Sequence, residues 1–555
     1  MTSTTSHPDI GHGECLAHVV HISDKRITPA RVQWRDGVIT AIEDVNGAAD
    51  RLPYLIPGFV DAHVHIESSM LTPAEFGRIA VRHGTVAVVT DPHEIANVLG
   101  EAGMQFMLDN GHQTPFVCYF GAPSCVPATA FETAGAVLDS RVLNNLLDNP
   151  DVHFLSEVMN YPGVLAGDAD LLAKLRLARE KGMPIDGHAP GLMGEPLRRY
   201  VDERIITDHE CTEIAEAEAK LAAGMAILIR EGSAARNFEA LHQLIGRYPD
   251  RVMFCSDDKH PDDLQAGHIN RLVARAVAYR HDVFDVLQCA CLNPIRHYGL
   301  SLGQLRVGDR MDAALVKDLV EFKVLKTWIA GRCVAEDGKS LLPHVKPRAI
   351  NRFQARYVAA GDFQIAGNGR DIRVIEAYDG QLLTGQRILK PKLRDGLLEA
   401  DMDRDLLWLA VVNRYRPEPP AVAFITGFGL RVGALASSVA HDSHNIVAVG
   451  CDIESLCTAV NAVIDCQGGI ACVSEAGLAC LPLPIAGLMS DQDGDSVAAR
   501  YANLDAIAKT MGSTLRAPFM TLSFMALLVI PELKLSDQGL FDGKRFQFTS
   551  LWVEP

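Results

Sequence analysis

The chain has 555 residues, of which 48% are hydrophobic and 22% charged, a composition typical of a folded globular protein and not of a disordered or collagen-like chain. Its 69 acidic residues outnumber 52 Lys and Arg and give a net charge of −17. Because such a surface repels phosphate backbones, we expect no nucleic-acid partner and instead a small or neutral ligand.

The first residues of the chain, MTSTTSH, contain no cationic stretch followed by an apolar core. We therefore expect no secretory leader and a cytoplasmic protein. The longest nearly apolar stretch, residues 517–531, is shorter than the roughly 20 residues that span a bilayer, which predicts a buried strand or helix and no membrane partner. The 13 cysteines include no C-x-x-C pair, so we expect reduced core cysteines and neither a zinc knuckle nor a redox motif.

Short segments rich in β-branched residues occupy residues 16–42 and predict a small β-sheet. After residue 53 the pattern changes, and short apolar runs alternate with helical segments such as 73–84, 169–182 and 213–224. Eight such runs follow one another, at 54–60, 85–90, 116–120, 152–155, 183–185, 204–207, 225–229 and 252–255.

Eight strand–helix units predict a TIM-like (β/α)8 barrel, with a doubly wound open sheet as the competing architecture. Residues 308–319 and 322–334 return to strand-like alternation, so we expect them to complete the N-terminal sheet. Further strand-like segments and a helical segment at 453–465 predict an additional C-terminal α+β domain. The expected boundaries are 1–55 and 306–350 for the two parts of the small β domain, 56–305 for the barrel and 351–555 for the C-terminal domain.

The strongest chemical signal is DAHVH, in which His63 and His65 lie where the first barrel strand is expected to end. Residues two apart in a strand point to the same face, so both imidazoles can reach one metal from the barrel mouth. Further candidate ligands follow later strands, namely Glu157, His188, His209 and Asp257. In a closed barrel these strand ends meet at one rim.

Four histidines and two carboxylates form a site suited to Zn²⁺, Mn²⁺ or Fe²⁺. We expect His63, His65 and Asp257 to hold one of two metal ions, and His188 and His209 the other. Glu157 is placed to bridge them. Such a pair turns a shared water into a bridging hydroxide nucleophile, which predicts metal-assisted hydrolysis. Asp257 would accept the proton of the hydroxide and pass it to a leaving nitrogen.

Polar residues beyond these strand ends are further candidates. Glu67 keeps the strand parity of His65 and can face the pocket, the alternative being an exposed loop carboxylate. DPHE after the second strand is expected to bind substrate or to support a ligand, and DKH after the eighth strand to contact substrate or close the site. The candidate catalytic residues are Asp257, Glu67 and His93, and the candidate substrate-binding residues are Asp91, Glu94, Asp258, Lys259 and His260.

The motif His441-Asp-Ser-His444 in the C-terminal region has the composition of a metal site. Since the barrel ligands already complete a two-metal site, we interpret this motif as a domain-interface or pocket-closing cluster.

Long motifs connect the chain to a known family. They are PGFVDAHVHIESSMLTP (57–73), VVTDPHEIANVLG (88–100), DGHAPGL (186–192), FCSDDKHPDDL (254–264) and PELKLSDQGLFDG (531–543). With these motifs the chain resembles the adenine deaminase family of the amidohydrolase superfamily over nearly its whole length. The resemblance implies hydrolysis of adenine to hypoxanthine and ammonia at a binuclear site, with Glu157 standing where many superfamily members use a carboxylated lysine. The implied metal ligands are His63, His65, Glu157, His188, His209 and Asp257.

Two other functions remain as alternatives: a cyclic amidohydrolase of the hydantoinase or dihydropyrimidinase type, and a metal-binding barrel without catalysis. Strand-end spacing alone does not separate adenine from a cyclic amide, and the resemblance selects adenine. We expect a purine base as the small-molecule partner and, from the surface of the added domain, a homo-oligomer of two or more chains.

Overall fold

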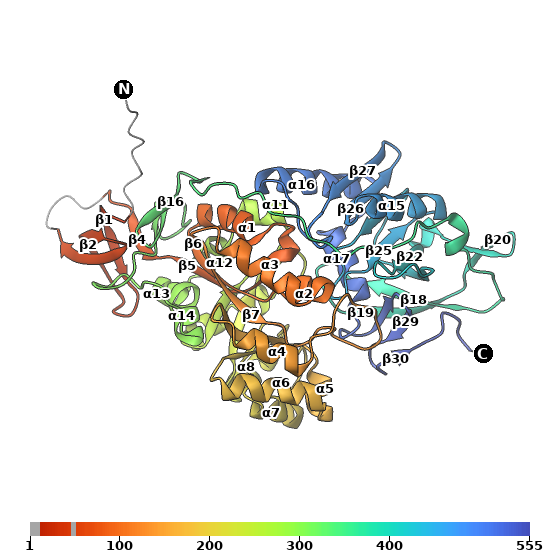
Figure 1. Cartoon of the computed structure of the whole chain (residues 1–555), viewed down its shortest axis with the longest axis horizontal. Coiled ribbons are helices and arrows are strands. Elements are labelled where there is room, and N and C mark those ends of the chain that lie inside the picture. Colours follow the sequence, from red (N-terminus) through yellow and green to blue (C-terminus); the bar gives the residue numbers. More distant parts are fainter. Residues whose placement is uncertain (1–10, 46–50, 555) are drawn as a thin grey trace.

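The computed structural model describes residues 11–45 and 51–554 (Figure 1). The expectation of no secretory leader falls on residues outside these ranges. Within the described ranges, every helix is too short or too polar to cross a bilayer. All 13 cysteines lie in the described ranges and are free.

A closed barrel of parallel strands forms the centre of the molecule, as predicted, and the open-sheet alternative is wrong. Its strands in chain order are β5 (Phe59–His65), β6 (Thr85–Thr90), β7 (Val117–Ala122), β8 (Val152–Val158), β9 (Ile185–Gly187), β10 (Thr207–Asp208), β11 (Ala226–Arg230) and β12 (Val252–Cys255). The ring closes where β13 (Asp257–Asp258), which continues β12, pairs in parallel with β5. On the other side, the backbone N–H of Ile206 donates to Ile185 O at 3.1 Å and joins β10 to β9.

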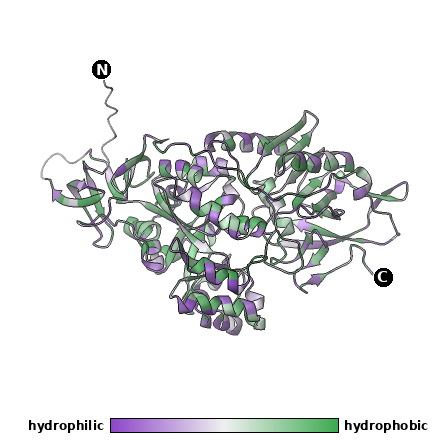
Figure 2. Cartoon of the chain, in the orientation of Figure 1, coloured by the Kyte–Doolittle hydropathy of each residue, from purple (hydrophilic) through white to green (hydrophobic). Residues whose placement is uncertain are grey.

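Strands β6, β11 and β12 are buried on both faces, which explains their mostly apolar runs. β5 is equally buried but carries Asp61, His63 and His65. Figure 2 shows strands mainly in the hydrophobic colour and surface helices in bands of both colours. The helices around the barrel are α1 (Pro73–Ala80), α2 (His93–Leu99), α3 (Glu101–Gly111), α4 (Ser140–Leu147), α5 (Tyr161–Ala166), α6 (Ala169–Glu180), α7 (Gly194–Asp202), α8 (Ile214–Ala222), α9 (Phe238–Leu241), α10 (Leu244–Arg247), α11 (Pro261–Ala266), α12 (Ile269–Ala278), α13 (Val283–Leu287) and α14 (Asn293–Tyr298).

The first apolar run, predicted as one strand over 54–60, is two strands that belong to different sheets. β4 (Tyr54–Pro57) lies in the small sheet, and β5 begins the barrel after Gly58. A Cβ atom at Gly58 would lie 2.3 Å from a methyl group of Val86, so glycine lets the chain pass close to the neighbouring strand. β5 continues to His65, beyond the end of the predicted run at residue 60.

The small sheet joins strands from before and after the barrel, as predicted. Its order is β17-β16-β15-β14-β4-β1-β2-β3. The strands are β1 (Gly13–His21), β2 (Arg26–Arg35), β3 (Val38–Asp44), β14 (Ala313–Val316), β15 (Val324–Ile329), β16 (Arg332–Glu336) and β17 (Lys339–Ser340). β4 lies between β1, its parallel partner, and β14, its antiparallel partner.

The C-terminal region is an α+β domain around a second eight-stranded sheet, in the order β19-β18-β23-β22-β25-β24-β26-β27. These strands are β18 (Ile372–Ala377), β19 (Thr384–Leu389), β22 (Leu407–Val412), β23 (Ala421–Thr426), β24 (Ala434–Ser437), β25 (Ile446–Gly450), β26 (Gly469–Ser474) and β27 (Gly477–Pro482). Helix α15 (Ile453–Asp465) packs on this sheet, and α16 (Gly494–Thr510) contacts α11 and α1 of the barrel. The apolar stretch 517–531 contains the buried helix α17 (Pro518–Ser523).

Candidate functional site

Six candidate metal ligands lie together at the C-terminal ends of the barrel strands, and all six are buried. They are His63 and His65 of β5, Glu157 of β8, His188 after β9, His209 after β10 and Asp257 of β13. The barrel topology brings these residues together although they are distributed over about 200 positions of the chain.

The two histidines of β5 and Asp257 form one half of this cluster. The Nε2 atoms of His63 and His65 lie 3.2 Å apart, and Asp257 Oδ1 lies 3.7 Å from the first and 3.3 Å from the second. Asp61, on the same strand, accepts a hydrogen bond from the backbone N–H of Ser256 at 2.9 Å. This bond ties β5 to the chain immediately before Asp257, so the strand positions the carboxylate as well as both imidazoles.

Glu157 lies between the two halves of the cluster. Its Oε1 is 3.4 Å from His65 Nε2. Its Oε2 is 2.8 Å from His188 Nδ1 and 3.1 Å from His209 Nε2. One carboxylate thus contacts histidines from three strands, the position expected of a bridging ligand.

A divalent cation fits this set of donors. Ligand atoms of His63, His65 and Asp257 lie within 4.8 Å of one another, and so do those of His63, Glu157 and His209. His188 directs Nδ1 at the carboxylates of this set, 2.8 Å from Glu157 Oε2 and 3.5 Å from Glu210 Oε1. Imidazole and carboxylate without thiolate suit Zn²⁺, Mn²⁺ or Fe²⁺.

The charges of the cluster also favour a cation. Burial by itself raises the pKa of Asp257, but Arg230 and His65 outweigh it and hold this pKa well below its usual range. Burial likewise opposes the ionised form of Glu157, but His188 and His209 outweigh it and lower the pKa of this carboxyl. Both carboxyl groups therefore stay ionised in the barrel and can serve as anionic ligands of a cation.

Two residues of the cluster, Glu210 and Arg230, are absent from the sequence predictions. Arg230 Nη1 lies 2.5 Å from Asp257 Oδ2, and Arg230 Nη2 donates to Glu210 Oε2 at 2.8 Å. Glu210 Oε1 is also 3.3 Å from His209 Nε2. Arg230 is the last residue of β11, the seventh barrel strand, so its place at a strand end was the signal that could have identified it.

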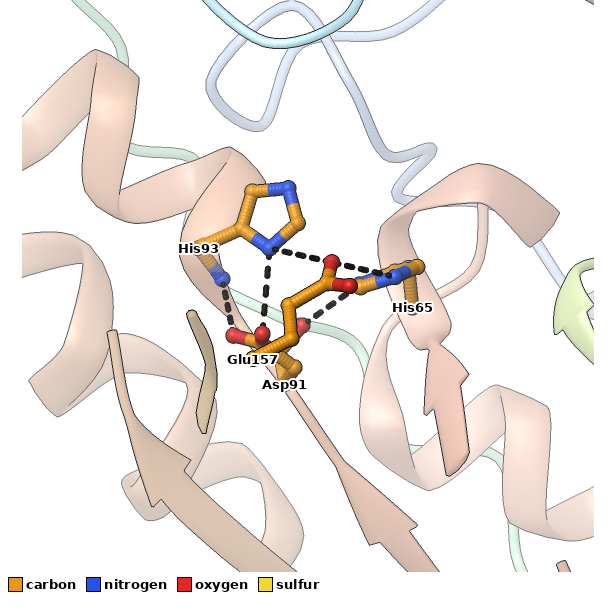
Figure 3. Close-up of side chains that lie close together, drawn as sticks. All are labelled: His65, Asp91, His93 and Glu157. Carbon is orange, nitrogen blue, oxygen red and sulfur yellow. Dashed lines mark hydrogen bonds and ion pairs between the residues drawn. The ribbon is translucent and has the colours of Figure 1, made fainter. Parts of the chain in front are cut away.

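His93 lies beside this cluster and is oriented by Asp91 (Figure 3). His93 Nδ1 is 3.2 Å from Asp91 Oδ2 and 3.6 Å from Glu157 Oε1. The backbone carbonyl of Asp91 lies 3.0 Å from His65 Nδ1. A proton on that Nδ1 leaves His65 Nε2 free to bind a metal, so Asp91 supports both histidines.

A small cavity at the rim of the barrel, which we call the catalytic cavity, is lined in part by His65, His93, Glu157, His188, His209 and Asp257. Glu67 lies outside this cavity. The strand ends at His65 and a 3-10 turn, Ile66–Ser69, follows, so strand parity does not extend to Glu67. Glu67 is buried, and its Oε1 accepts a hydrogen bond from the backbone N–H of Ile95 at 3.2 Å. The carboxylate therefore contacts the first turn of α2, the helix that begins at His93.

The other substrate-binding candidates differ in their access to the cavity. Asp258 lines it, and Ser68 Oγ joins Asp258 Oδ1 at 2.6 Å to Glu94 Oε1 at 2.9 Å. Lys259 and His260 are buried and do not line the cavity. Lys259 Nζ lies 3.4 Å from the carbonyl oxygen of Glu231, and the His260 ring packs against Tyr501.

The C-terminal domain supplies one wall of the catalytic cavity. The residues that it contributes are Leu382, His441, Asp442, Phe524, Leu527 and Val529. The remaining lining residues come from the barrel and include five of the six metal-ligand candidates, all except His63. The apolar stretch 517–531 therefore covers the site in addition to being buried. His444 does not line the cavity, and its Nδ1 lies 3.1 Å from the backbone nitrogen of Ala440.

The catalytic cavity has a volume of about 20 Å³, room for about one water molecule. A second cavity of about 880 Å³ adjoins it and shares Glu210, Arg230 and Leu382 with it. The larger cavity extends between the barrel and residues 379–383 and 530–531 of the C-terminal domain.

Lys534 supports the apolar wall of the cavity from behind. It is fully buried, and its Nζ donates to Leu382 O at 2.7 Å and to Phe524 O at 3.0 Å. Burial lowers the pKa of this ammonium group to about 7. Between about pH 7 and the unfolded pKa of about 10.4, the unfolded chain therefore holds a proton that the folded chain has released.

Lys534 should consequently make the protein more stable as the pH rises through this window. The expected contribution to the free energy of unfolding is up to about 1.4 kcal/mol per pH unit. Urea unfolding of the wild type and of Lys534→Met at pH 7.5, 8.5 and 9.5 measures this contribution. The free energy of unfolding of the variant should rise less with pH, because the variant lacks the titrating ammonium group. Parallel curves for the two proteins would show that Lys534 is not the titrating group.

Comparison with known proteins places the chain in a family. An amidohydrolase family model matches residues 54–334, and a model of the adenine deaminase C-terminal domain matches residues 381–547. An adenine deaminase from Salinibacter ruber is 54% identical over 538 residues, which cover 97% of this chain and 98% of the relative. An adenine deaminase from Methanosarcina mazei is 48% identical over 549 residues, which cover 97% of this chain and 99% of the relative. The chain therefore belongs to the adenine deaminase family of the amidohydrolases.

Proposed function

We propose that this chain catalyses the hydrolytic deamination of adenine to hypoxanthine and ammonia. The observation that carries the proposal is the buried set of four histidines and two carboxylates at one rim of the barrel, closed by the C-terminal domain. Relatives named adenine deaminase, similar over nearly the whole chain, support the choice of adenine.

The proposed site holds two divalent cations, with Mn²⁺, Fe²⁺ and Zn²⁺ as the candidates. His63, His65 and Asp257 would hold one of them, His188 and His209 the other, and Glu157 both. When bound, such a pair would supply a hydroxide nucleophile near neutral pH for attack on C6 of adenine.

Asp257 is the proposed proton shuttle. Its Oδ1 faces His63 and His65, while Arg230 contacts Oδ2 and fixes the orientation of the carboxylate. The low pKa of the group means that it begins the reaction ionised and can accept a proton. It would then deliver this proton to the leaving amino group, a transfer typically worth about 10²–10⁴-fold in rate.

His93 is proposed to contact the substrate, since it lines the cavity beside Glu157. Asp91 orients its ring, and Glu67 holds the turn from which it projects. Glu94 and Asp258 are proposed to shape the substrate wall through Ser68, and Lys259 and His260 to hold the loop after β13. We further propose that the protein acts in the cytoplasm as a homo-oligomer of two or more chains.

Purified protein loaded with Mn²⁺ is expected to convert adenine to hypoxanthine, seen as a change in ultraviolet absorbance with release of one ammonia per adenine. Protein loaded with Fe²⁺ or Zn²⁺ serves as a comparison. Hydantoin and dihydrouracil should not be hydrolysed under the same conditions. Absence of adenine turnover with all three metals, or faster turnover of a cyclic amide, would contradict the proposal.

A further inference from the structure

Two neighbouring residues of the C-terminal domain present buried polar atoms to the catalytic cavity. His441 and Asp442 both line it, and each residue is 3% exposed. His441 Nε2 and Asp442 Oδ2 have no hydrogen-bond partner within the described part of the chain. A buried polar atom without a partner is costly, so a pair of them on a cavity wall indicates a ligand that completes their hydrogen bonds.

His441 is held as a hydrogen-bond donor. Its Nδ1 is 3.0 Å from Glu94 Oε1, and its Nε2 is 3.9 Å from Asp258 Oδ1, too far for a hydrogen bond. Burial opposes the charged ring, but the carboxylates of Glu94 and Asp258 outweigh it and raise the pKa of His441 to about 9. In the imidazolium form both ring nitrogens carry hydrogen, so Nε2 offers an N–H to the cavity.

Asp442 is held as an acceptor. Its Oδ1 lies 3.5 Å from His93 Nε2, and Oδ2 is left without a partner. Burial raises the pKa of this carboxyl, but His93 outweighs that effect and lowers it. An ionised carboxylate only accepts hydrogen bonds. The loop thus presents a donor and an acceptor on consecutive residues.

Free adenine has a matching edge. With C6 directed at the metal ligands, the opposite edge of the purine presents N3, an acceptor, next to N9–H, a donor. The imidazole of His93 lies between Asp442 and Glu157. Its Nε2 is 3.5 Å from Asp442 Oδ1, and its Nδ1 is 3.6 Å from Glu157 Oε1. Asp442 therefore stands about one ring away from the metal ligands, where the far edge of a purine would lie.

We propose that the His441 side chain donates to N3 and the Asp442 side chain accepts from N9–H, so that this loop selects the free base against purines substituted at N9. The inference rests on the proposed function for the orientation of the ring. In a nucleoside N9 carries the sugar and has no hydrogen, which leaves the Asp442 carboxylate buried without a partner. A site built to bind a donor rejects the analogue that lacks it.

The apolar part of the wall must yield when the base enters. The cavity of about 20 Å³ holds about one water molecule and no purine ring. Leu382 borders both this cavity and the one of about 880 Å³ next to it, so displacement of its side chain joins the two spaces. His441 and Asp442, in contrast, are held by Glu94 and His93.

Equilibrium binding tests this assignment apart from turnover. The ligands are purine, which lacks the amino group to be lost, and 9-methylpurine, titrated by calorimetry into the Mn²⁺-loaded protein. The wild type should bind purine at least about 10-fold more tightly than 9-methylpurine. Asp442→Ala should weaken purine binding roughly 10- to 100-fold and remove most of the preference.

Two further variants separate this role from a general effect on the loop. His441→Leu should also weaken binding of purine but keep the preference against 9-methylpurine, because it removes the contact to N3 alone. Ser443→Ala is the matched control from the same loop, since Ser443 does not line the cavity, and it should bind both ligands as the wild type does.

The results distinguish this inference from the proposed function. Equal binding of purine and 9-methylpurine by the wild type, or a preference that survives Asp442→Ala, overturns the inference even if adenine is turned over. A preference that Asp442→Ala removes supports it even if adenine is not a substrate, in which case the proposed function alone fails. No binding of either ligand overturns the inference as well.

Discussion

Replacement of Asp257 with asparagine is expected to lower kcat for adenine by about 10²–10⁴-fold, the typical contribution of a positioned acid or base. Asparagine has nearly the same shape but cannot accept the proton. Arg230 would also lose its ion pair with residue 257, while its contact with Glu210 would remain. The loss should appear in kcat more than in KM, because the carboxylate acts on the reacting atoms and not on the distant edge of the purine.

The measurement is steady-state kinetics at saturating Mn²⁺, with the metal content of each preparation determined by mass spectrometry. Asp262→Asn is a suitable control, since Asp262 belongs to α11, the helix that follows β13, and does not line the cavity. A preparation of Asp257→Asn with full metal content and a kcat within a few-fold of the wild type would show that the proton shuttle is another group.

Glu157→Gln should impair the binding of both metal ions and reduce activity by at least about 100-fold. Glu157 contacts His65, His188 and His209, so it is the shared member of both halves of the cluster. Glutamine offers one oxygen and no charge, which leaves the cations with one carboxylate fewer in a buried site. Loss even of a group that only supports a metal ligand typically costs 10- to 100-fold in affinity.

Equilibrium dialysis against a fixed Mn²⁺ concentration, followed by metal analysis, tests this expectation. Glu132→Gln is the matched control, because burial raises the pKa of Glu132 to about 8 and the side chain is already largely uncharged near pH 7. That variant should keep its metal. Retention of two full equivalents by Glu157→Gln would exclude a bridging role.

Much of the barrel could be predicted because strands buried on both faces need apolar residues throughout. The same logic located the metal-ligand candidates, since polar residues directly after such strands can only meet at the rim. It failed at Gly58, where close packing against Val86 splits one apolar run between two sheets. It also failed at Glu67, because a 3-10 turn replaces the strand after His65.

The remaining part of the site depends on contacts between residues that lie far apart in the chain, and no pattern in the sequence indicates these contacts. Arg230 and Glu210 pair across neighbouring strands, and neither residue type at a strand end indicates by itself that a partner is present. His441, Asp442 and Phe524 reach the cavity only because the C-terminal domain packs over the barrel. The position of that domain is determined by surface complementarity and not by the local pattern of residues.

The arrangement of the small sheet has a consequence for synthesis of the chain. Strand β4 needs β14 as a neighbour, and the roughly 250 residues between Pro57 and Ala313 take on the order of 10 to 50 s to make at about 5–20 residues per second. Throughout this interval one edge of β4 lacks its native partner. Nascent chains on neighbouring ribosomes carry the same open edge, and an unpaired edge is a template for pairing with another chain. The first barrel strand, β5, begins directly after Gly58, next to β4. Rapid closure of the barrel would therefore block access of other chains to the open edge of β4 before β14 leaves the ribosome.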